Sequence, residues 1–237
     1  MPAAATRSGP GTALAVAMLA LSGGTALANG DVKDFSPAER ALFMSDQLTK
    51  LHPPLTLHYR FRKSGSLESG FTDTASITLR AQANGGCCDA AGEFLSGERR
   101  VTLPPVEHAS SNPVTLYFLE RDVREMQRLT KGQSTYFRKR IRMAVYQGAT
   151  LRDVTVAYLG KTVAGREITI SPYLDDPNRP RFDKLANKQY VFTMSDAVPG
   201  GVYAIRTLIS DASKGAEAPP LLAEELLIDG AATKPSR

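Results

Sequence analysis

Basic and aromatic side chains gather in one short segment of this sequence, and they are well suited to hold a ligand. Between Arg128 and Arg142 there is no acidic residue, and the basic residues are Arg128, Lys131, Arg138, Lys139, Arg140 and Arg142. Arginine binds carboxylate and phosphate groups through paired hydrogen bonds, and neighbouring aromatic rings cover apolar surface. We predict an anion-binding site formed by Tyr136, Phe137, Arg138, Arg140 and Arg142. The alternative is a solvated strand face whose charges protect a sheet edge from aggregation.

Carboxylates close together on one helix can form an acid–base pair, and Glu120, Asp122 and Glu125 have suitable spacing. Arginines at positions 121, 124 and 128 lie among them, which favours surface ion pairs instead. The sequence also lacks the G-x-S-x-G, G-x-x-x-x-G-K-[ST] and H-E-x-x-H motifs. We therefore predict no catalytic residue and a protein that is not an enzyme. A weaker alternative is an enzyme whose site uses Glu120 and Asp196.

The two cysteines, Cys87 and Cys88, are adjacent and follow two glycines, so we expect them at a loop tip between two strands. In an oxidising compartment they could form a vicinal ring, bond to another molecule or remain free. Adjacent cysteines are poorly placed for an unstrained bridge, which favours an incidental loop pair. The three histidines, His52, His58 and His108, lack the spacing of a zinc site. We predict no metal and no cofactor.

The first 28 residues have the features of a secretory signal peptide. Arg7 precedes a short apolar segment at 13–21, and Ala26-Leu27-Ala28 is a typical cleavage site. We expect cleavage after about Ala28 and a mature protein in the periplasm. The apolar segment is shorter than a membrane span, and no later segment is long enough, so we predict no transmembrane anchor in the mature chain.

The composition is that of a globular protein. The chain has 237 residues, of which 42% are hydrophobic and 22% charged, and this excludes collagen-like, coiled-coil and wholly disordered chains. Cleavage removes Arg7 and no acidic residue, so 29 basic and 24 acidic residues become 28 and 24, a net charge of +4. Charge alone permits nucleic-acid binding, but the compartment argues against it, and we predict no nucleic-acid partner.

Two helices and several strands must position these side chains. Ser36-Pro37 with Glu39 begins a helix that we expect to end near Lys50, and Asn112-Pro113 begins a second helix at 113–131. Alternation of apolar and polar residues predicts strands at 55–62, 71–81, 93–103, 154–158, 168–170, 190–194 and 202–208. The segment 137–145 is favoured as a further strand over a helix, and 221–228 as a short docked helix.

The order of these elements predicts the fold class. Strands and helices do not alternate regularly, which disfavours a doubly wound nucleotide fold. We predict a mainly β (α+β) protein, a strongly curved antiparallel sheet or half-barrel with one packed central helix and an N-terminal helix. The predicted parts are a signal peptide (1–28), an N-terminal helix and linker (29–54), a single antiparallel β domain (55–212) and a partly disordered C-terminal tail (213–237).

Three stretches resemble a group of uncharacterised exported proteins of proteobacteria. They are NPVTLYFLERDVREM (112–126), YFR (136–138) and SDAVPGG (195–201), within a likeness that runs from about Leu55 to Leu208. The resemblance implies export and a single domain, and it assigns no activity and no site. More loosely, the predicted architecture is similar to periplasmic half-barrels of the lipoprotein-carrier type.

These features lead to two main hypotheses of function. The first is a non-enzymatic exported envelope protein that binds an apolar or anionic envelope component: a lipid, a glycolipid or a lipoprotein. Its apolar lining would be the inner sheet face, Tyr59, Phe61, Ile77 and Leu79, and its head-group ligands would be Arg138, Arg140 and Arg142. The alternative is a structural or assembly factor that binds another envelope protein through a sheet edge or an exposed helix.

Overall fold

Strand β1 (Leu55–Gly65) shows how alternation in the sequence becomes a sheet. Leu57, Tyr59 and Phe61 are buried, whereas His58 and Arg60 between them are exposed. This is the period of two of an extended chain with one face toward the core. The computed structural model describes residues 35–83, 85–211 and 219–232, which belong to one compact unit. The predicted signal peptide lies outside these residues.

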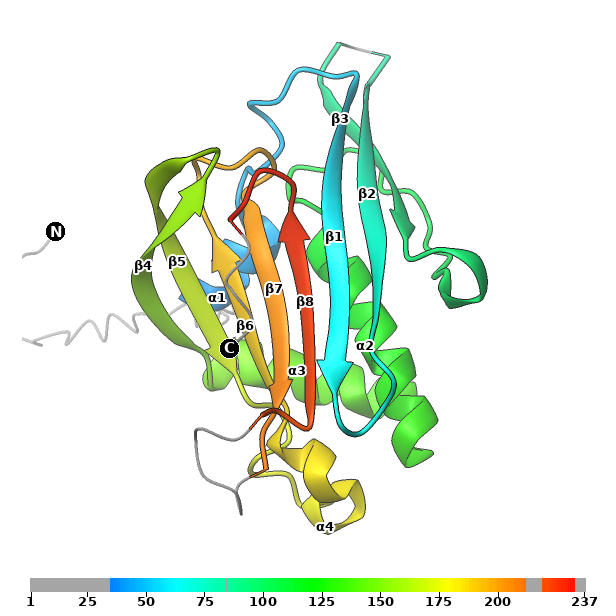
Figure 1. The fold of residues 1–237 in the computed structure, drawn as a ribbon. Coiled ribbons are helices and arrows are strands. Elements are labelled where there is room, and N and C mark those ends of the chain that lie inside the picture. The colour runs from blue at the N-terminus through cyan, green and yellow to red at the C-terminus, as the bar shows by residue number, and fades with distance from the viewer. Residues whose placement is uncertain (1–34, 84, 212–218, 233–237) are drawn as a thin grey trace, which may run out of the picture. The chain divides into compact units, whose positions relative to one another are not determined.

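Eight antiparallel strands form a curved sheet in the described part of the chain (Figure 1), which confirms the predicted fold class. Their order in space is β3-β2-β1-β8-β7-β6-β5-β4. Besides β1, the strands are β2 (Phe71–Ala81), β3 (Cys87–Phe94), β4 (Thr150–Tyr158), β5 (Lys161–Ile170), β6 (Gln189–Met194), β7 (Val202–Ile209) and β8 (Leu222–Ile228). Hairpins join β1 to β2, β4 to β5 and β6 to β7, where the turn residues predict them.

Strand β8 overturns the prediction of a docked helix at 221–228. It lies in the middle of the sheet, where Tyr59 of β1 pairs with Ile228 and Ile205 of β7 pairs with Leu226. The segment is rich in Leu and Glu, which favour a helix when local preference decides. Hydrogen bonding along both edges of β8 overrides that preference.

Strand β3 also differs from the prediction, which placed the third strand at 93–103. Half of the residues of β3 are Asp, Ala or Gly, which have low strand preference, so alternation does not reveal this strand. Gly97–Arg99 is a 3-10 turn instead, and Val101 bridges back to Phe94. Cys87 and Cys88 therefore begin a strand and do not occupy a loop tip.

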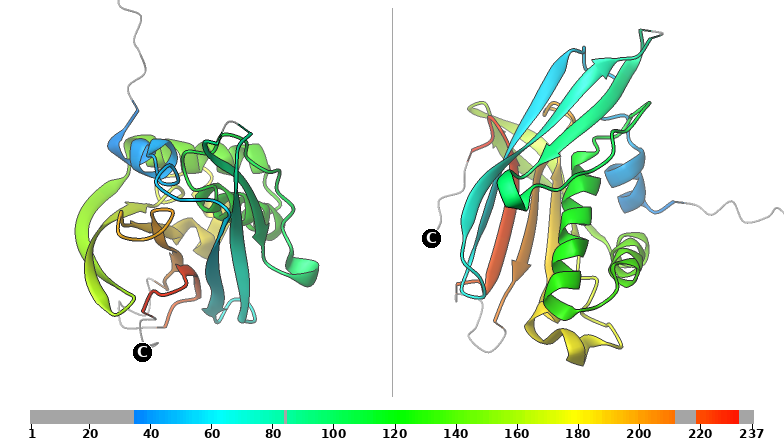
Figure 2. Two further views of the ribbon diagram at one scale, coloured as in Figure 1. Left: turned by 90° about the horizontal axis from the view of Figure 1, so that it is seen from above. Right: turned by 90° about the vertical axis from the view of Figure 1, so that its right-hand side faces the viewer.

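The sheet curls until β4 meets the chain that follows β8. The Leu159 amide donates a hydrogen bond to the Gly230 carbonyl over 2.8 Å, and the Ala232 amide donates to the Ala157 carbonyl over 3.1 Å. Tyr158 and Ala231 form an antiparallel bridge between these two bonds. Figure 2 shows β4 and β5 bent around in this way. Strands β4 to β8 thus close locally into a partial barrel. Strands β1 to β3 continue the same sheet beyond β8, outside this barrel.

Helices cover one face of the sheet (Figure 2). They are α1 (Pro37–Glu39), α2 (Val114–Thr130) and α3 (Ser134–Gln147), and α1 continues as a π-helical turn at Arg40–Met44. A fourth short helix, α4 (Arg179–Phe182), and a 3-10 turn (Asp183–Asn187) follow β5. Helix α2 confirms the prediction at 113–131, and the Val114 amide donates to Asn112 Oδ1 over 3.1 Å. Ser36 and Glu39 form the predicted capping box.

The N-terminal helix ends at Met44 and not near Lys50 as predicted. The Ala41 carbonyl accepts hydrogen bonds from Ser45 Oγ over 2.9 Å and from Gln47 Nε2 over 3.0 Å. These side chains take the place of the next helical amides, and the chain turns away.

Helix α3 overturns the prediction of a strand at 137–145. Its buried residues, Phe137, Ile141 and Val145, are four residues apart, which is helical spacing. Met143, which produced part of the apparent alternation, is 36% exposed.

The core lies between the sheet and α2. The rings of Phe61 from β1, Phe94 from β3 and Phe118 from α2 lie with their centroids 6.2 to 6.4 Å apart. Ile77 and Leu79 of β2 are fully buried beside them. The inner sheet face that the sequence analysis assigned to a ligand is therefore filled by the protein's own side chains.

Candidate functional site

A groove opens in the helical layer. It lies between α1 with its π-helical turn (37–44, called the N-terminal turns below), the loop 102–106, α2 and α3. Its volume is about 660 Å³, within the range of roughly 300 to 1,000 Å³ that is typical of pockets for small ligands. Its apolar lining consists of Phe35, Phe43, Met44, Leu103, Pro104, Val106, Leu116, Tyr117, Leu119, Val123, Ile141 and Val145. We call this surface the helical groove.

Helical periodicity gives α2 two apolar sides. Phe118 and Met126 are fully buried in the core, whereas Leu116, Leu119 and Val123 line the groove at spacings of three and four residues. The sequence carries a signal of this second side, because the apolar arc on α2 is wider than one packing face requires.

Large apolar side chains are exposed where the groove opens. Leu116 is 52% exposed, Phe35 49% and Met44 48%. Single exposed apolar residues are common on protein surfaces, but several gathered around one concavity are typical of a binding site. Phe35 and Met44 belong to no sequence motif. Their place at the groove depends on how the N-terminal turns pack against α3.

The charged rim of the groove is organised around Glu120. Arg138 donates from Nη2 to Glu120 Oε1 over 2.7 Å and from Nε to Oε2 over 2.9 Å, and Arg124 Nε lies 3.6 Å from Oε1. The hydrogen bonds from Arg138, reinforced by the charges of Arg138 and Arg124, hold the pKa of Glu120 below its ordinary value. Two rim arginines are thus already paired with a carboxylate.

Arg142 differs from those two arginines. It lines the groove one helical turn after Arg138, is exposed, and makes no ion pair with any residue within 35–83, 85–211 and 219–232. Glu39, the other carboxylate of the rim, accepts a hydrogen bond from the Ser36 amide over 2.9 Å. Arg142 is therefore the rim cation best placed to meet a ligand's negative charge.

Tyr136 and Arg140, which the sequence analysis placed in the same site, hold a loop instead. Tyr136 donates to Asp176 Oδ1 over 2.5 Å, and Arg140 Nε lies 2.8 Å from Asp176 Oδ2 and 3.1 Å from the Pro172 carbonyl. The prediction assumed a strand, on which residues 138, 140 and 142 share a face. On a helix, residues 138 and 142 share a face and residue 140 lies on another.

Phe137 is a core residue. Its ring is fully buried, with centroids 5.9 Å from Tyr173 and 5.7 Å from Phe182. Of the five predicted site residues, Arg138 and Arg142 thus come together at the groove. The other three side chains support the helix that carries them.

A network of buried charges lies between α2 and the sheet. Lys188 contacts Asp122, and both side chains are almost completely buried. Lys188 Nζ also lies 3.6 Å from Glu224 Oε2, and Arg121 pairs with Glu224 over 2.5 Å. Lys63 Nζ extends the network, 3.9 Å from Glu224 Oε1. The prediction that Arg121 and Asp122 form surface ion pairs is therefore wrong, although it holds for Glu120.

Burial and charge act in opposite directions on this network. Burial alone would raise the pKa of Glu224, but the charges of Lys188 and Arg121 lower it to about 2. Burial likewise disfavours the Lys188 ammonium, but Asp122 and Glu224 raise the pKa of Lys188 above its ordinary value. Each charge has a partner and none of these residues lines the groove, so the network is a packing element.

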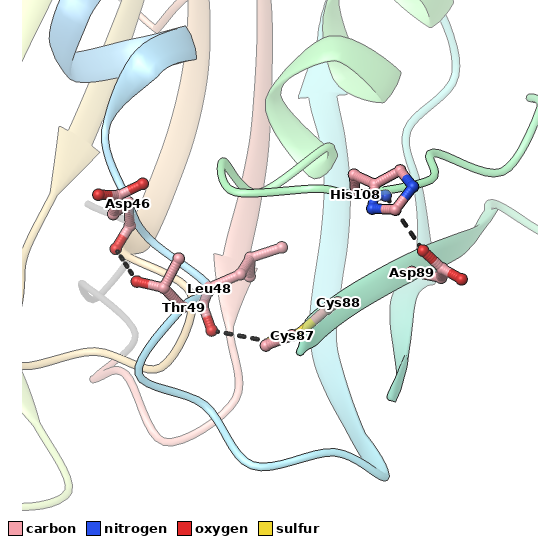
Figure 3. Close-up of a disulfide and its surroundings, with 7 residues drawn as sticks. All are labelled: Asp46, Leu48, Thr49, Cys87, Cys88, Asp89 and His108. Carbon is pink, nitrogen blue, oxygen red and sulfur yellow. Dashed lines mark hydrogen bonds between the residues drawn. A yellow bond between two sulfur atoms is a disulfide. The ribbon is translucent and has the colours of Figure 1, made fainter. Parts of the chain in front are cut away.

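Cys87 and Cys88 form a vicinal disulfide at the start of β3 (Figure 3). A vicinal ring is one of the three states left open by the sequence, and the incidental loop pair that we favoured is not the state found. Cys87 Sγ lies 3.1 Å from the Leu48 carbonyl, and the Ala109 amide donates to the Cys88 carbonyl over 2.8 Å. The pair therefore sits between the segment after the N-terminal turns and the loop that enters α2.

Glu120 and Asp196, the residues of the enzyme alternative, line different surfaces. Glu120 lines the helical groove, whereas Asp196 is exposed in a second, more polar groove of about 1130 Å³ between the N-terminal turns and β4 to β6. Within the described ranges, no three His, Cys, Asp or Glu side chains are grouped to hold a metal ion.

Comparisons with known proteins identify no family. No family model matches this chain, and no curated protein matches it either. Among solved structures, the lipoprotein LppX of Mycobacterium tuberculosis is similar over 78% of this chain and 90% of that chain, with 10% identity and a TM-score of 0.33. At that level of likeness we assign neither family nor function from it.

No helix in the described residues is long and apolar enough to cross a membrane.

Proposed function

We propose that this protein is a non-enzymatic exported protein of the cell envelope that binds the apolar chain of a lipid in the helical groove. The observation that carries the proposal is one concave surface where Phe35, Met44 and Leu116 remain about half exposed beside Arg138 and Arg142. Burial of a hydrocarbon chain removes these side chains from water, and the guanidinium rim suits a polar head group. The periplasmic location follows from the predicted signal peptide and is part of the proposal.

Burial of the ligand chain in the groove predicts how affinity depends on chain length. Each buried methylene contributes about 0.8 kcal/mol, so affinity should rise about fourfold for each methylene added to the chain. The rise should stop when the chain fills the groove. A ligand held by its head group alone would show no such dependence.

Native mass spectrometry of protein purified gently from the periplasm, followed by organic extraction, tests the proposal. A reproducible lipid adduct is the expected result. The variant Leu116→Ser should lose the adduct, whereas Leu159→Ser should keep it, because Leu159 is 68% exposed but lies at the β4–β5 turn outside the groove. An empty protein with a co-purifying protein partner would overturn lipid binding in favour of an assembly factor.

A further inference from the structure

The rim of the helical groove has a small and unevenly distributed charge. Three arginines, Arg124, Arg138 and Arg142, stand against two carboxylates, Glu39 and Glu120, so the rim has an excess of one positive charge. The distribution matters more than the total, because it determines which charges are still available to a ligand.

Glu120 is already paired with two of the three arginines. Both of its carboxylate oxygens accept hydrogen bonds from Arg138, and Arg124 lies 3.6 Å from one of them. Glu120 is only partly exposed, with 23% of its side chain accessible, so it competes well for these guanidinium groups against an incoming anion.

Arg142 has no such competitor within ion-pair distance in the described chain. Its guanidinium can donate two parallel hydrogen bonds to a carboxylate. A single negative charge on the ligand would therefore be matched. A second negative charge would find the other two rim arginines already paired with Glu120, and the Glu120 carboxylate would repel it.

We propose that the helical groove selects single-chain amphiphiles with one negative charge, of the long-chain carboxylate class, and that Arg142 binds the carboxylate while Glu120 excludes a doubly charged head group. This inference rests on the proposed function, because it requires that the groove hold the chain. It assigns Arg142 as a ligand-binding residue and Glu120 as a specificity-determining residue.

The test compares three ligands that share one chain: dodecanoate, dodecyl phosphate and dodecan-1-ol. The two ionic ligands are titrated into the protein below their micelle concentrations, and dodecan-1-ol below its solubility limit. The pH is about 8, where a phosphate monoester carries close to two charges. The proteins are the wild type, Arg142→Gln, Glu120→Gln and the matched control Lys139→Gln. Lys139 is an exposed cation on α3 that does not line the groove.

The wild type should bind dodecanoate about tenfold more tightly than either of the other ligands. Arg142→Gln should lose this preference for dodecanoate without changing dodecan-1-ol binding, and Lys139→Gln should behave as the wild type. Glu120→Gln should bind dodecyl phosphate about tenfold more tightly than the wild type does, because Arg138 and Arg124 are then released. Glu120→Gln should leave the affinity for dodecan-1-ol unchanged, because a misfolded variant with newly exposed apolar surface would bind all three ligands more tightly.

The two proposals fail in different ways. If none of the three ligands binds, chain binding in the groove is wrong and both proposals fall. If dodecan-1-ol binds as well as dodecanoate, or if Arg142→Gln and Lys139→Gln have equal effects, only the charge selection is overturned. An unchanged affinity of Glu120→Gln for dodecyl phosphate would refute the role of Glu120.

Discussion

Replacing Lys188 with methionine should destabilise the fold far more than replacing a surface cation. The Lys188 side chain is 1% exposed and contacts Asp122, which is completely buried. In Lys188→Met, Glu224 would keep its 2.5 Å pair with Arg121, and Tyr190 would still donate a hydrogen bond to Asp122. Asp122 would nevertheless be a buried carboxylate without a cation. Removing one partner from a buried ion pair costs about 3 to 5 kcal/mol, and the remaining contacts place this variant near 3.

Urea denaturation followed by far-UV circular dichroism and tyrosine fluorescence measures the effect. Urea leaves the ionic strength unchanged, and the chain contains no tryptophan. The control is Arg152→Met, which removes the exposed pair with Glu167 at 2.5 Å and should cost less than about 1 kcal/mol. Adding Asp122→Asn to Lys188→Met should recover part of the loss. Equal costs for Lys188→Met and Arg152→Met would refute the view that a buried charge was left unpaired.

Three further predictions concern stability. The pKa of Glu224 falls from 4.5 to about 2 on folding, so Glu224 should contribute about 3 kcal/mol to the free energy of unfolding above pH 4.5, and this contribution should be lost as the pH falls from 4.5 through about 2. Urea titrations at several pH values would show a flat profile if this is wrong. Phe137→Ala should cost about 3 to 5 kcal/mol, because its ring is fully buried; a change in ligand affinity with unchanged stability would contradict its place in the core. Gly92→Ala should lower the melting temperature, because the new Cβ would lie 1.9 Å from Tyr117 Cε2 and overpacking costs about 1 to 3 kcal/mol. The matched variant Gly148→Ala should have little effect, because the atom nearest to its new Cβ would be 3.4 Å away.

Elements with a clear period of two could be predicted from the sequence, and elements defined by distant partners could not. The alternation that begins at Leu57, Tyr59 and Phe61 is a local property, and it located β1 correctly. Strand β8 depends on pairing with β1 and β7, which no local pattern encodes. Helix α3 was misread because Met143 imitated a strand period, although the spacing of Phe137 and Ile141 is helical.

The candidate site was predictable in its charges more than in its apolar surface. Arg138 and Arg142 were selected from composition, and they lie together because four residues make about one helical turn. Phe35 and Met44 gave no signal, since their exposure depends on how the N-terminal turns dock against α3. Glu120 was assigned correctly to ion pairs, but its position between two groove arginines required the structure.

The central place of β8 has a consequence for how the protein is made. Chain synthesis delivers β1 to β3 and then β4 to β7 as two separate groups of strands, and β8, which joins them, is delivered last. Until it arrives, β1 and β7 each have an edge that lacks its native neighbour, and such edges are templates for aggregation. A nascent chain that stops short of residue 222 would therefore be exposed to misassembly along both edges. Protection of these edges depends on completing nearly the whole polypeptide.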